Sequence, residues 1–363
     1  MGARSSLIIS ALFFALFGCS ATDGSVDAGS PDAPFSCPDA TSDLTTSDLT
    51  TSDATTGDAS ADLGTPTLDD LSALGSCTVS ASSLQFLVAG RLVDVEVHSP
   101  QQTLAGDGCS TDIWRPLLFF PENAIEPDAY AESVKYWVSW GYTVYVPRTF
   151  APPTGLAHAD ALVEAQALIA SLIAARPPAI NSDFKFAVSG HGYGARLALL
   201  LALAEDQISS VILIDPLDST LAESGVAKLT SHDFASFTAP LLLVAQNTNE
   251  TCTTPDCTPC TPNGDGYRHF FPLSETPTIQ ITIKGADHWD WLDYAACGFL
   301  CELCEEGYAQ NDRVKALSRK YVMAFLRLTF EGEPAYSDLL LGEGFEDSEA
   351  SQRQNRAAYC GYR

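Results

Sequence analysis

Short apolar runs alternate with longer segments of helical spacing from Thr67 onward. The run at 116–120 (PLLFF) carries no polar side chain, which is typical of a strand buried on both faces of a sheet. The Ala- and Leu-rich stretch 158–175 has helical spacing and ends just before two prolines, which terminate helices. The predicted strands lie at 84–97 (the first strands), 116–120, 142–146, 184–188, 208–214, 241–245 and 279–283, and the predicted helices at 127–140, 158–175, 192–205 and 311–329.

This alternation of strands and helices predicts an α/β fold with a mostly parallel central sheet and helices on both faces. We expect one domain over residues 67–363, which is long enough for a single buried core. In such a sheet the functional crevice lies beyond the carboxyl ends of the strands. The residues that directly follow each strand are therefore the candidates for chemistry.

The first 19 residues have the pattern of an export signal. Arg4 gives a positive start, the apolar run 7–17 is too short to span a bilayer comfortably, and residues 16–19 (LFGC) resemble a bacterial lipobox. In that pattern the cysteine is acylated and becomes the mature N-terminus. We therefore expect a lipid anchor at Cys19 and a place at the cell envelope, on the outer membrane or the cell surface. An ordinary secretory signal or a buried N-terminal helix is the alternative.

Residues 20–66 form a polar segment whose middle repeats every five residues, as TSDLT, TSDLT, TSDAT and TGDAS. The segment has nine Asp and no Lys or Arg, and it buries too little apolar surface to offset its ordering entropy. We expect a disordered tether with an r.m.s. reach of about 40 Å. The whole chain carries a formal charge of −27, which argues against a nucleic-acid partner because phosphate would be repelled.

The chain contains 11 Cys, and setting aside an acylated Cys19 leaves an even number, as expected for disulfides in an oxidising compartment. Sequence alone does not assign the pairs, although Cys77 with Cys109 is one candidate. Zinc held by the two C-x-x-C runs at 257–260 and 301–304 is the alternative. Export favours disulfides, and we expect no metal or other cofactor. The disulfide candidates are Cys77, Cys109, Cys252, Cys257, Cys260, Cys297, Cys301 and Cys304.

The strand predicted at 184–188 leads through residues 189–195 (SGHGYGA) into a helix. A strand, a Gly-x-x-x-Gly turn and a helix have the layout of a nucleophile elbow, whose middle residue normally carries a hydroxyl group. Here the middle residue is Gly192. Asp215 follows the next strand and His288 follows the last one, which gives the order elbow, acid, histidine of the α/β hydrolases. In that arrangement the acid orients the imidazole, and the imidazole acts as base.

These residues resemble those of chlorophyllases and of related dienelactone-hydrolase-like and polyester-hydrolase-like esterases. The resemblance covers about residues 84–336 and implies an α/β-hydrolase fold with Asp215 and His288 as two members of a triad. The family's serine would stand at Gly192. The matching segments are 191–194 (HGYG), 214–218 (IDPLD), 260–264 (CTPNG), 269–271 (HFF), 287–293 (DHWDWLD), 324–326 (AFL) and 330–332 (FEG).

Two departures from the family's pattern oppose acyl transfer. Gly192 supplies no nucleophile, and removing a triad nucleophile costs on the order of a millionfold in turnover. Relatives carry a His-Gly pair after the strand 116–120, which helps to form the oxyanion hole, whereas this chain has Pro121-Glu122-Asn123. The backbone N–H of Tyr193 would still serve as one oxyanion donor. Glu122 would bring negative charge to the place where an oxyanion develops.

We therefore expect a lipid-anchored, catalytically impaired esterase relative that binds a small ester or carboxylate. The ligand would rest at the N-terminus of the helix 192–205, where backbone N–H groups are free. The alternatives are an active carboxylic-ester hydrolase that uses another nucleophile or activated water, and an activity built on the Cys clusters. If Asp215 and His288 are aligned, the substitution Gly192→Ser is expected to produce weak esterase activity.

Overall fold

The structure is a computed structural model that describes residues 66–102, 108–111, 113–151, 156–175, 185–218, 228–248, 260–261, 265–274, 276–341 and 350–354. The predicted signal and tether lie outside the described residues, apart from Pro66, which the tether includes. The anchor residue Cys19 and the disulfide candidates Cys252 and Cys257 also lie outside them.

Nine strands form one sheet in the described part of the chain, with the order β1-β2-β4-β3-β5-β6-β7-β8-β9. The five neighbouring pairs from β4 across to β8 are parallel. The edge pairs β1–β2, β2–β4 and β8–β9 are antiparallel. The strands are β1 (Thr78–Val88), β2 (Arg91–Gln101), β3 (Pro116–Phe120), β4 (Thr143–Pro147), β5 (Phe186–His191), β6 (Ile208–Ile214), β7 (Leu241–Ala245), β8 (Thr278–Ile283) and β9 (Ala350–Gln354).

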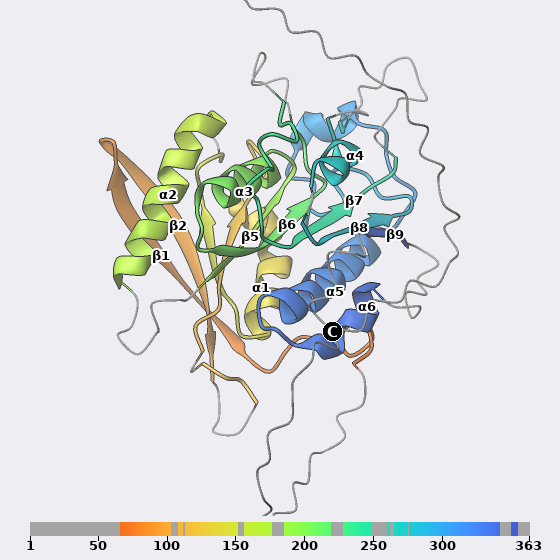
Figure 1. Ribbon diagram of the computed structural model, residues 1–363, viewed down its shortest axis with the longest axis horizontal. Helices are drawn as coiled ribbons and strands as arrows, with labels where there is room; N and C mark the ends of the chain where they lie inside the picture. The colour runs from red at the N-terminus through yellow and green to blue at the C-terminus, as the bar shows by residue number, and fades with distance from the viewer. Residues whose placement is uncertain are drawn as a thin grey trace, which may run out of the picture. The chain divides into compact units, whose positions relative to one another are not determined.

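Helices cover both faces of this sheet (Figure 1), which confirms the predicted fold class. On one face lie α1 (Ala131–Ser139), α5 (Asn311–Thr329) and α6 (Ser337–Leu341), and on the other lie α2 (His158–Ala175) and α3 (Gly192–Ala204). Successive residues of β3 point to opposite faces, so Phe119 joins one core and Phe120 the other. Burial on both sides explains why the strand has no polar residue.

Helix α2 is long and apolar enough to cross a membrane by length and composition alone. Its Leu168 and Leu172 are buried in the same core as Leu197 and Leu201 of α3. A core helix passes the same test of length and composition, and this packing identifies α2 as one.

The structure differs from the predicted elements mainly at their ends. The segment 84–97 belongs to a hairpin of two 11-residue strands that turns at Ala89 and Gly90, both with positive φ. The helix predicted at 127–140 is a 3-10 turn (Pro127–Tyr130) followed by α1. Strand β5 begins later than predicted and continues to His191, because the elbow turn occupies a single residue. Strand β9 and the short helices α4 (Tyr267–Phe270) and α6 were not predicted.

Three disulfides link described cysteines: Cys77–Cys109, Cys260–Cys304 and Cys297–Cys301. The predicted pair Cys77–Cys109 is present. The zinc alternative is wrong for its three described cysteines, Cys260, Cys301 and Cys304, because each sulfur is bonded to another sulfur and no longer offers a thiolate.

Candidate functional site

The elbow is a tight turn that small residues make possible. A Cβ added to Gly190 would overlap the backbone of Gly194, and one added to Gly194 would overlap the backbone oxygens of Phe120 and Pro121. Gly192 has φ +50°, in the left-handed region that favours glycine. A side chain at this position carries backbone strain of about 1–3 kcal/mol, which glycine avoids.

Asp215 and His288 meet at the carboxyl edge of the sheet, as the sequence predicts. Asp215 directly follows β6, and His288 lies in the loop after β8. The Nδ1 atom of His288 lies 2.6 Å from Oδ2 of Asp215. Both side chains are buried, with exposed fractions of 0% for Asp215 and 2% for His288. Gly192 lies beside them, since a Cβ added to it would come within 2.9 Å of Cε1 of His288.

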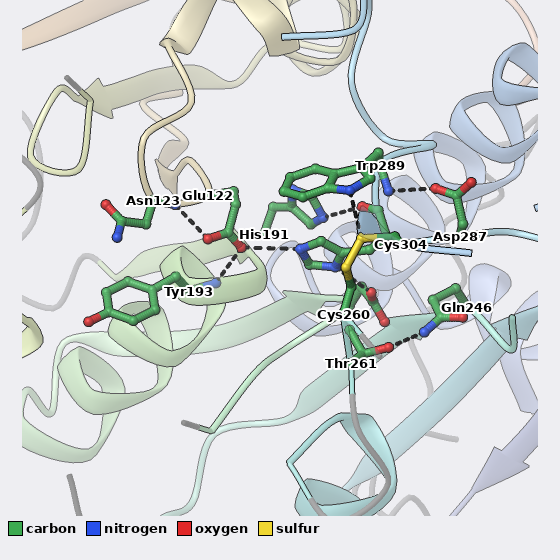
Figure 2. A network of polar contacts seen from close by, with 12 residues as sticks. Glu122, Asn123, His191, Tyr193, Gln246, Cys260, Thr261, Asp287, Trp289 and Cys304 are labelled. Atoms are coloured by element: carbon green, nitrogen blue, oxygen red, sulfur yellow. Dashed lines mark hydrogen bonds and ion pairs between the residues drawn. A yellow bond between two sulfur atoms is a disulfide. The ribbon is translucent and has the colours of Figure 1, made fainter. Parts of the chain in front are cut away.

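Glu122 fills the space where a serine side chain would stand. Its carboxylate extends from the loop after β3 to the turn at Gly192, and a Cβ on Gly192 would overlap Oε2 of Glu122. The same Oε2 accepts the backbone N–H of Tyr193 at 2.8 Å and lies 3.4 Å from Nε2 of His288. Figure 2 shows the Glu122 carboxylate in contact with both Tyr193 and Asn123. The backbone N–H of Asn123 donates to Oε1 of Glu122 at 2.7 Å.

The predicted oxyanion donor is therefore present and engaged by the protein itself. The N–H of Tyr193 lies in the first turn of α3, where the positive end of the helix dipole favours an anion. The carboxylate of Glu122 is that anion. The sequence placed Glu122 near the oxyanion donor, and in the structure its carboxylate accepts the N–H of Tyr193 directly. Pro121 contributes packing: its backbone oxygen lies against Gly194.

Two carboxylates hold the imidazole of His288. Burial by itself lowers the pKa of His288, but hydrogen bonds and charge attraction from Asp215 and Glu122 outweigh burial and raise the pKa to about 10. The ring is therefore protonated at neutral pH. A protonated ring has no lone pair with which to take a proton from a nucleophile or from water.

A chain of hydrogen bonds fixes Glu122 relative to His288, and sequence reasoning missed its two middle members, His191 and Tyr130. The Nε2–H of His191 donates to the backbone oxygen of His288 at 3.0 Å, because that oxygen can only accept. The Nδ1 atom of His191 therefore accepts the Tyr130 hydroxyl at 2.8 Å, and the hydroxyl oxygen accepts the N–H of Glu122 at 3.1 Å. Burial and the nearby charge of His288 lower the pKa of His191 well below its usual value, so its ring is neutral.

A second buried polar cluster lies behind the elbow and binds the backbone carbonyl of Tyr193. Nε2–H of His158 donates to the backbone oxygen of Tyr193 at 2.9 Å, and the two rings stack at 3.7 Å. Nδ1 of His158 lies 3.3 Å from the guanidinium of Arg196, whose Nε donates to Oδ1 of Asp218 at 3.0 Å. His269 approaches Oδ2 of Asp218 at 2.9 Å. Sequence reasoning missed this cluster too.

The loop that carries His288 is tied to a disulfide. The indole nitrogen of Trp289 donates to Sγ of Cys304 at 2.9 Å, and Cys304 is bonded to Cys260 (Figure 2). Asp287 accepts the backbone N–H groups of Trp289 and Gly307. These contacts tie the loop of His288 to the Cys260–Cys304 disulfide and to the backbone at Gly307. They hold the loop that carries His288 in place.

The geometry revises what a single substitution is expected to do. Gly192→Ser alone would drive its Cβ into Glu122, so aligning Asp215 and His288 is not sufficient for esterase activity. Ser189 gives no substitute nucleophile: it is buried in β5, and its Oγ has no hydrogen-bond partner among the described residues. Both Gly192 and Glu122 must change before a serine hydroxyl can face His288.

Comparison with known proteins identifies the same region of the chain. A sequence profile of the chlorophyllase family matches residues 95–343. Chlorophyllase-2 of Arabidopsis thaliana is 30% identical over 166 residues, which is 41% of this chain and 51% of the relative. The chain thus spans about half the length of the curated relative that it matches. The matched profile begins within β2, ends two residues past α6 and contains every residue of the site described above.

Proposed function

The chain belongs to the chlorophyllase family of α/β hydrolases, and on this premise we propose that it is an exported, lipid-anchored esterase relative that does not cleave esters. Ester cleavage in this fold needs a side-chain nucleophile at the elbow and a neutral imidazole to activate it. Gly192 offers no nucleophilic atom, and the Glu122 carboxylate occupies the place of one. That occupied place is the observation that carries the proposal.

Electrostatics supports the same conclusion for attack by water. The pair of carboxylates raises the pKa of His288 to about 10, so the ring cannot serve as base at neutral pH. The oxyanion of an attacked ester would also meet the carboxylate of Glu122 on the N–H of Tyr193. Loss of the nucleophile alone lowers turnover by about a millionfold.

The test is an esterase assay of the full-length protein, extracted from membranes in mild detergent. We expect the hydrolysis of p-nitrophenyl acetate and butyrate to match that of the His288→Gln variant and of buffer. The Glu126→Ala variant serves as a control, because Glu126 is an exposed carboxylate that pairs with Arg148. Turnover by the natural protein that disappears in His288→Gln would overturn the proposal and support an active hydrolase.

The anchor and the export route rest on the N-terminal pattern of the sequence. A lipobox-like segment ends at Cys19, a polar tether follows it, and the disulfides of the folded part suit an oxidising compartment. We expect the natural protein in the membrane fraction and the Cys19→Ala variant in the soluble fraction. Mass spectrometry of the N-terminal peptide then tests acylation directly, and an unmodified Cys19 contradicts the anchor.

A further inference from the structure

The Glu122 carboxylate lies beside Gly192, at the first turn of α3, as a bound ligand would lie. Its Oε2 is 2.8 Å from the backbone nitrogen of Tyr193 and 3.4 Å from Nε2 of His288. We propose that the space between the Tyr193 N–H and the His288 ring is a binding site for short carboxylates that the chain fills with its own Glu122, and that Gly192 is glycine because it makes room for this internal ligand. The inference rests on the proposed function, since a filled site cannot accept an ester.

The donors around the Glu122 carboxylate select for an anion. The Tyr193 N–H at the start of α3 and the imidazole of His288 both donate, and a carboxylate is the group that accepts two such bonds with charge assistance. Asp215 lies on the far nitrogen of His288 and keeps the ring charged. A neutral amide would offer a weaker acceptor and no charge to balance the imidazolium.

Gly192 and Glu122 form one coupled unit. With any side chain at position 192, the Cβ would overlap Oε2 of Glu122 and would crowd Cε1 of His288 at 2.9 Å. With glycine at 192 and no Glu122 side chain, the two donors would face an open place with no acceptor. The position of the Glu122 carboxylate therefore requires glycine at position 192.

The internal ligand keeps free carboxylates out by proximity. Glu122 is held next to the donors by its own chain, at an effective concentration in the millimolar range or above. Its backbone N–H donates to the Tyr130 hydroxyl, and its carboxylate Oε1 accepts the N–H of Asn123. We therefore expect the natural protein to ignore added acetate, and a variant that lacks the side chain to bind it.

The experiment measures thermal unfolding of the full-length Glu122→Ala variant against increasing sodium acetate. Acetate at ten times its Kd is expected to raise the Tm of this variant by about 3 °C, relative to sodium chloride at equal ionic strength. Acetamide, which has the same shape without the charge, is expected to leave the Tm unchanged. The natural protein and Glu126→Ala are expected to show no acetate-specific rise. Adding His288→Gln to Glu122→Ala is expected to abolish the response.

A folded Glu122→Ala variant with no acetate response, or an equal response in the natural protein, would overturn the inference. If Glu122→Ala does not fold, Glu122→Gln keeps the shape and removes the charge. NMR titration of the His288 ring is then expected to show a pKa well below the value of the natural protein, and an unchanged pKa would overturn the inference. Ester turnover with a normal acetate response would contradict only the proposed function, so the two failures are distinguishable.

Discussion

The residue Tyr193 separates two buried polar clusters that are built from similar parts and behave differently. In front of it, the N–H binds Glu122, and His288 lies between Glu122 and Asp215. We call this the front cluster. Behind it, the carbonyl accepts His158, whose other nitrogen faces the Arg196–Asp218 pair. We call this the back cluster.

The difference between the clusters lies in their cations. In the back cluster the cation is the guanidinium of Arg196, a planar group that donates to Asp218 from a fixed geometry. The imidazole of His288 titrates, and it serves two carboxylates, so the front cluster changes with pH and with any change in Glu122. Asp215 and Asp218 follow the same strand only three residues apart. The fold pairs Asp215 with His288 at the candidate site and pairs Asp218 with Arg196 behind it, so the two aspartates have different roles.

Opening the front cluster at both positions is expected to give the largest effect, which is on activity. Gly192→Ser with Glu122→Gly places a hydroxyl beside His288 and removes the carboxylate that blocks it. Hydrolysis of p-nitrophenyl acetate by this double variant is expected to exceed that of either single variant by about a hundredfold. Equal rates for Gly192→Ser alone and for the double variant would show that Glu122 does not block the site.

Breaking the back cluster is expected to give the largest effect on stability. Arg196→Met leaves the fully buried Asp218 without its guanidinium, which costs about 3–5 kcal/mol of unfolding free energy. Urea unfolding followed by circular dichroism measures this. Arg148→Met, which breaks the solvent-accessible pairs with Glu96 and Glu126, is the control and should cost at most about 1 kcal/mol for each pair. Similar losses of unfolding free energy in Arg196→Met and Arg148→Met would show that burial of the Arg196–Asp218 pair adds no stability.

The front cluster is expected to lose stability as the pH rises. The pKa of His288 is about 10 in the folded protein, above its ordinary value of 6.5. Its contribution is therefore complete below pH 6.5 and disappears as the pH rises toward 10, at on the order of 1 kcal/mol per pH unit.

The measurement compares the natural protein with His288→Gln by urea unfolding at pH 7 and pH 9.5. The difference between the two proteins should shrink at the higher pH. The groups that face the His288 ring are Asp215, Glu122 and the neutral His191. A difference that stays constant with pH would mean that His288 is not held protonated by its neighbours.

The smallest effect is expected at the partly exposed end of the back cluster. His269 is one of several donors to Asp218, and Arg196 remains when it is removed. His269→Asn should therefore cost about 1 kcal/mol by urea unfolding. A loss as large as that of Arg196→Met would show that His269, and not the guanidinium, carries the cluster.

The elements of the fold follow from local patterns, and the sequence predicts most of them. Apolar runs without polar residues marked the buried strands, and prolines marked helix ends. The ends of β5 and α1 were misplaced because turn geometry, at Gly192 and at Pro127, decided them. Strand β9 escaped prediction because its pairing with β8 joins segments about 70 residues apart.

The order of Gly192, Asp215 and His288 along the chain was enough to predict that they meet, because Gly192 and Asp215 directly follow parallel strands and His288 lies in the loop after another. Sequence alone also placed Glu122 near the oxyanion donor, without indicating that it reaches the donor. The hydrogen bond between Glu122 and Tyr193 joins residues 71 positions apart. The bond between His191 and the His288 carbonyl joins residues 97 apart.

By itself, the sequence determined the fold class, the position of the elbow and the absence of a serine there, since each depends on local spacing and residue type. Only the tertiary structure decided that the vacant place is filled. Whether a side chain from one loop occupies the gap left in another depends on the distance and direction between the two loops. The packing of the whole sheet sets that geometry, and no local pattern encodes it.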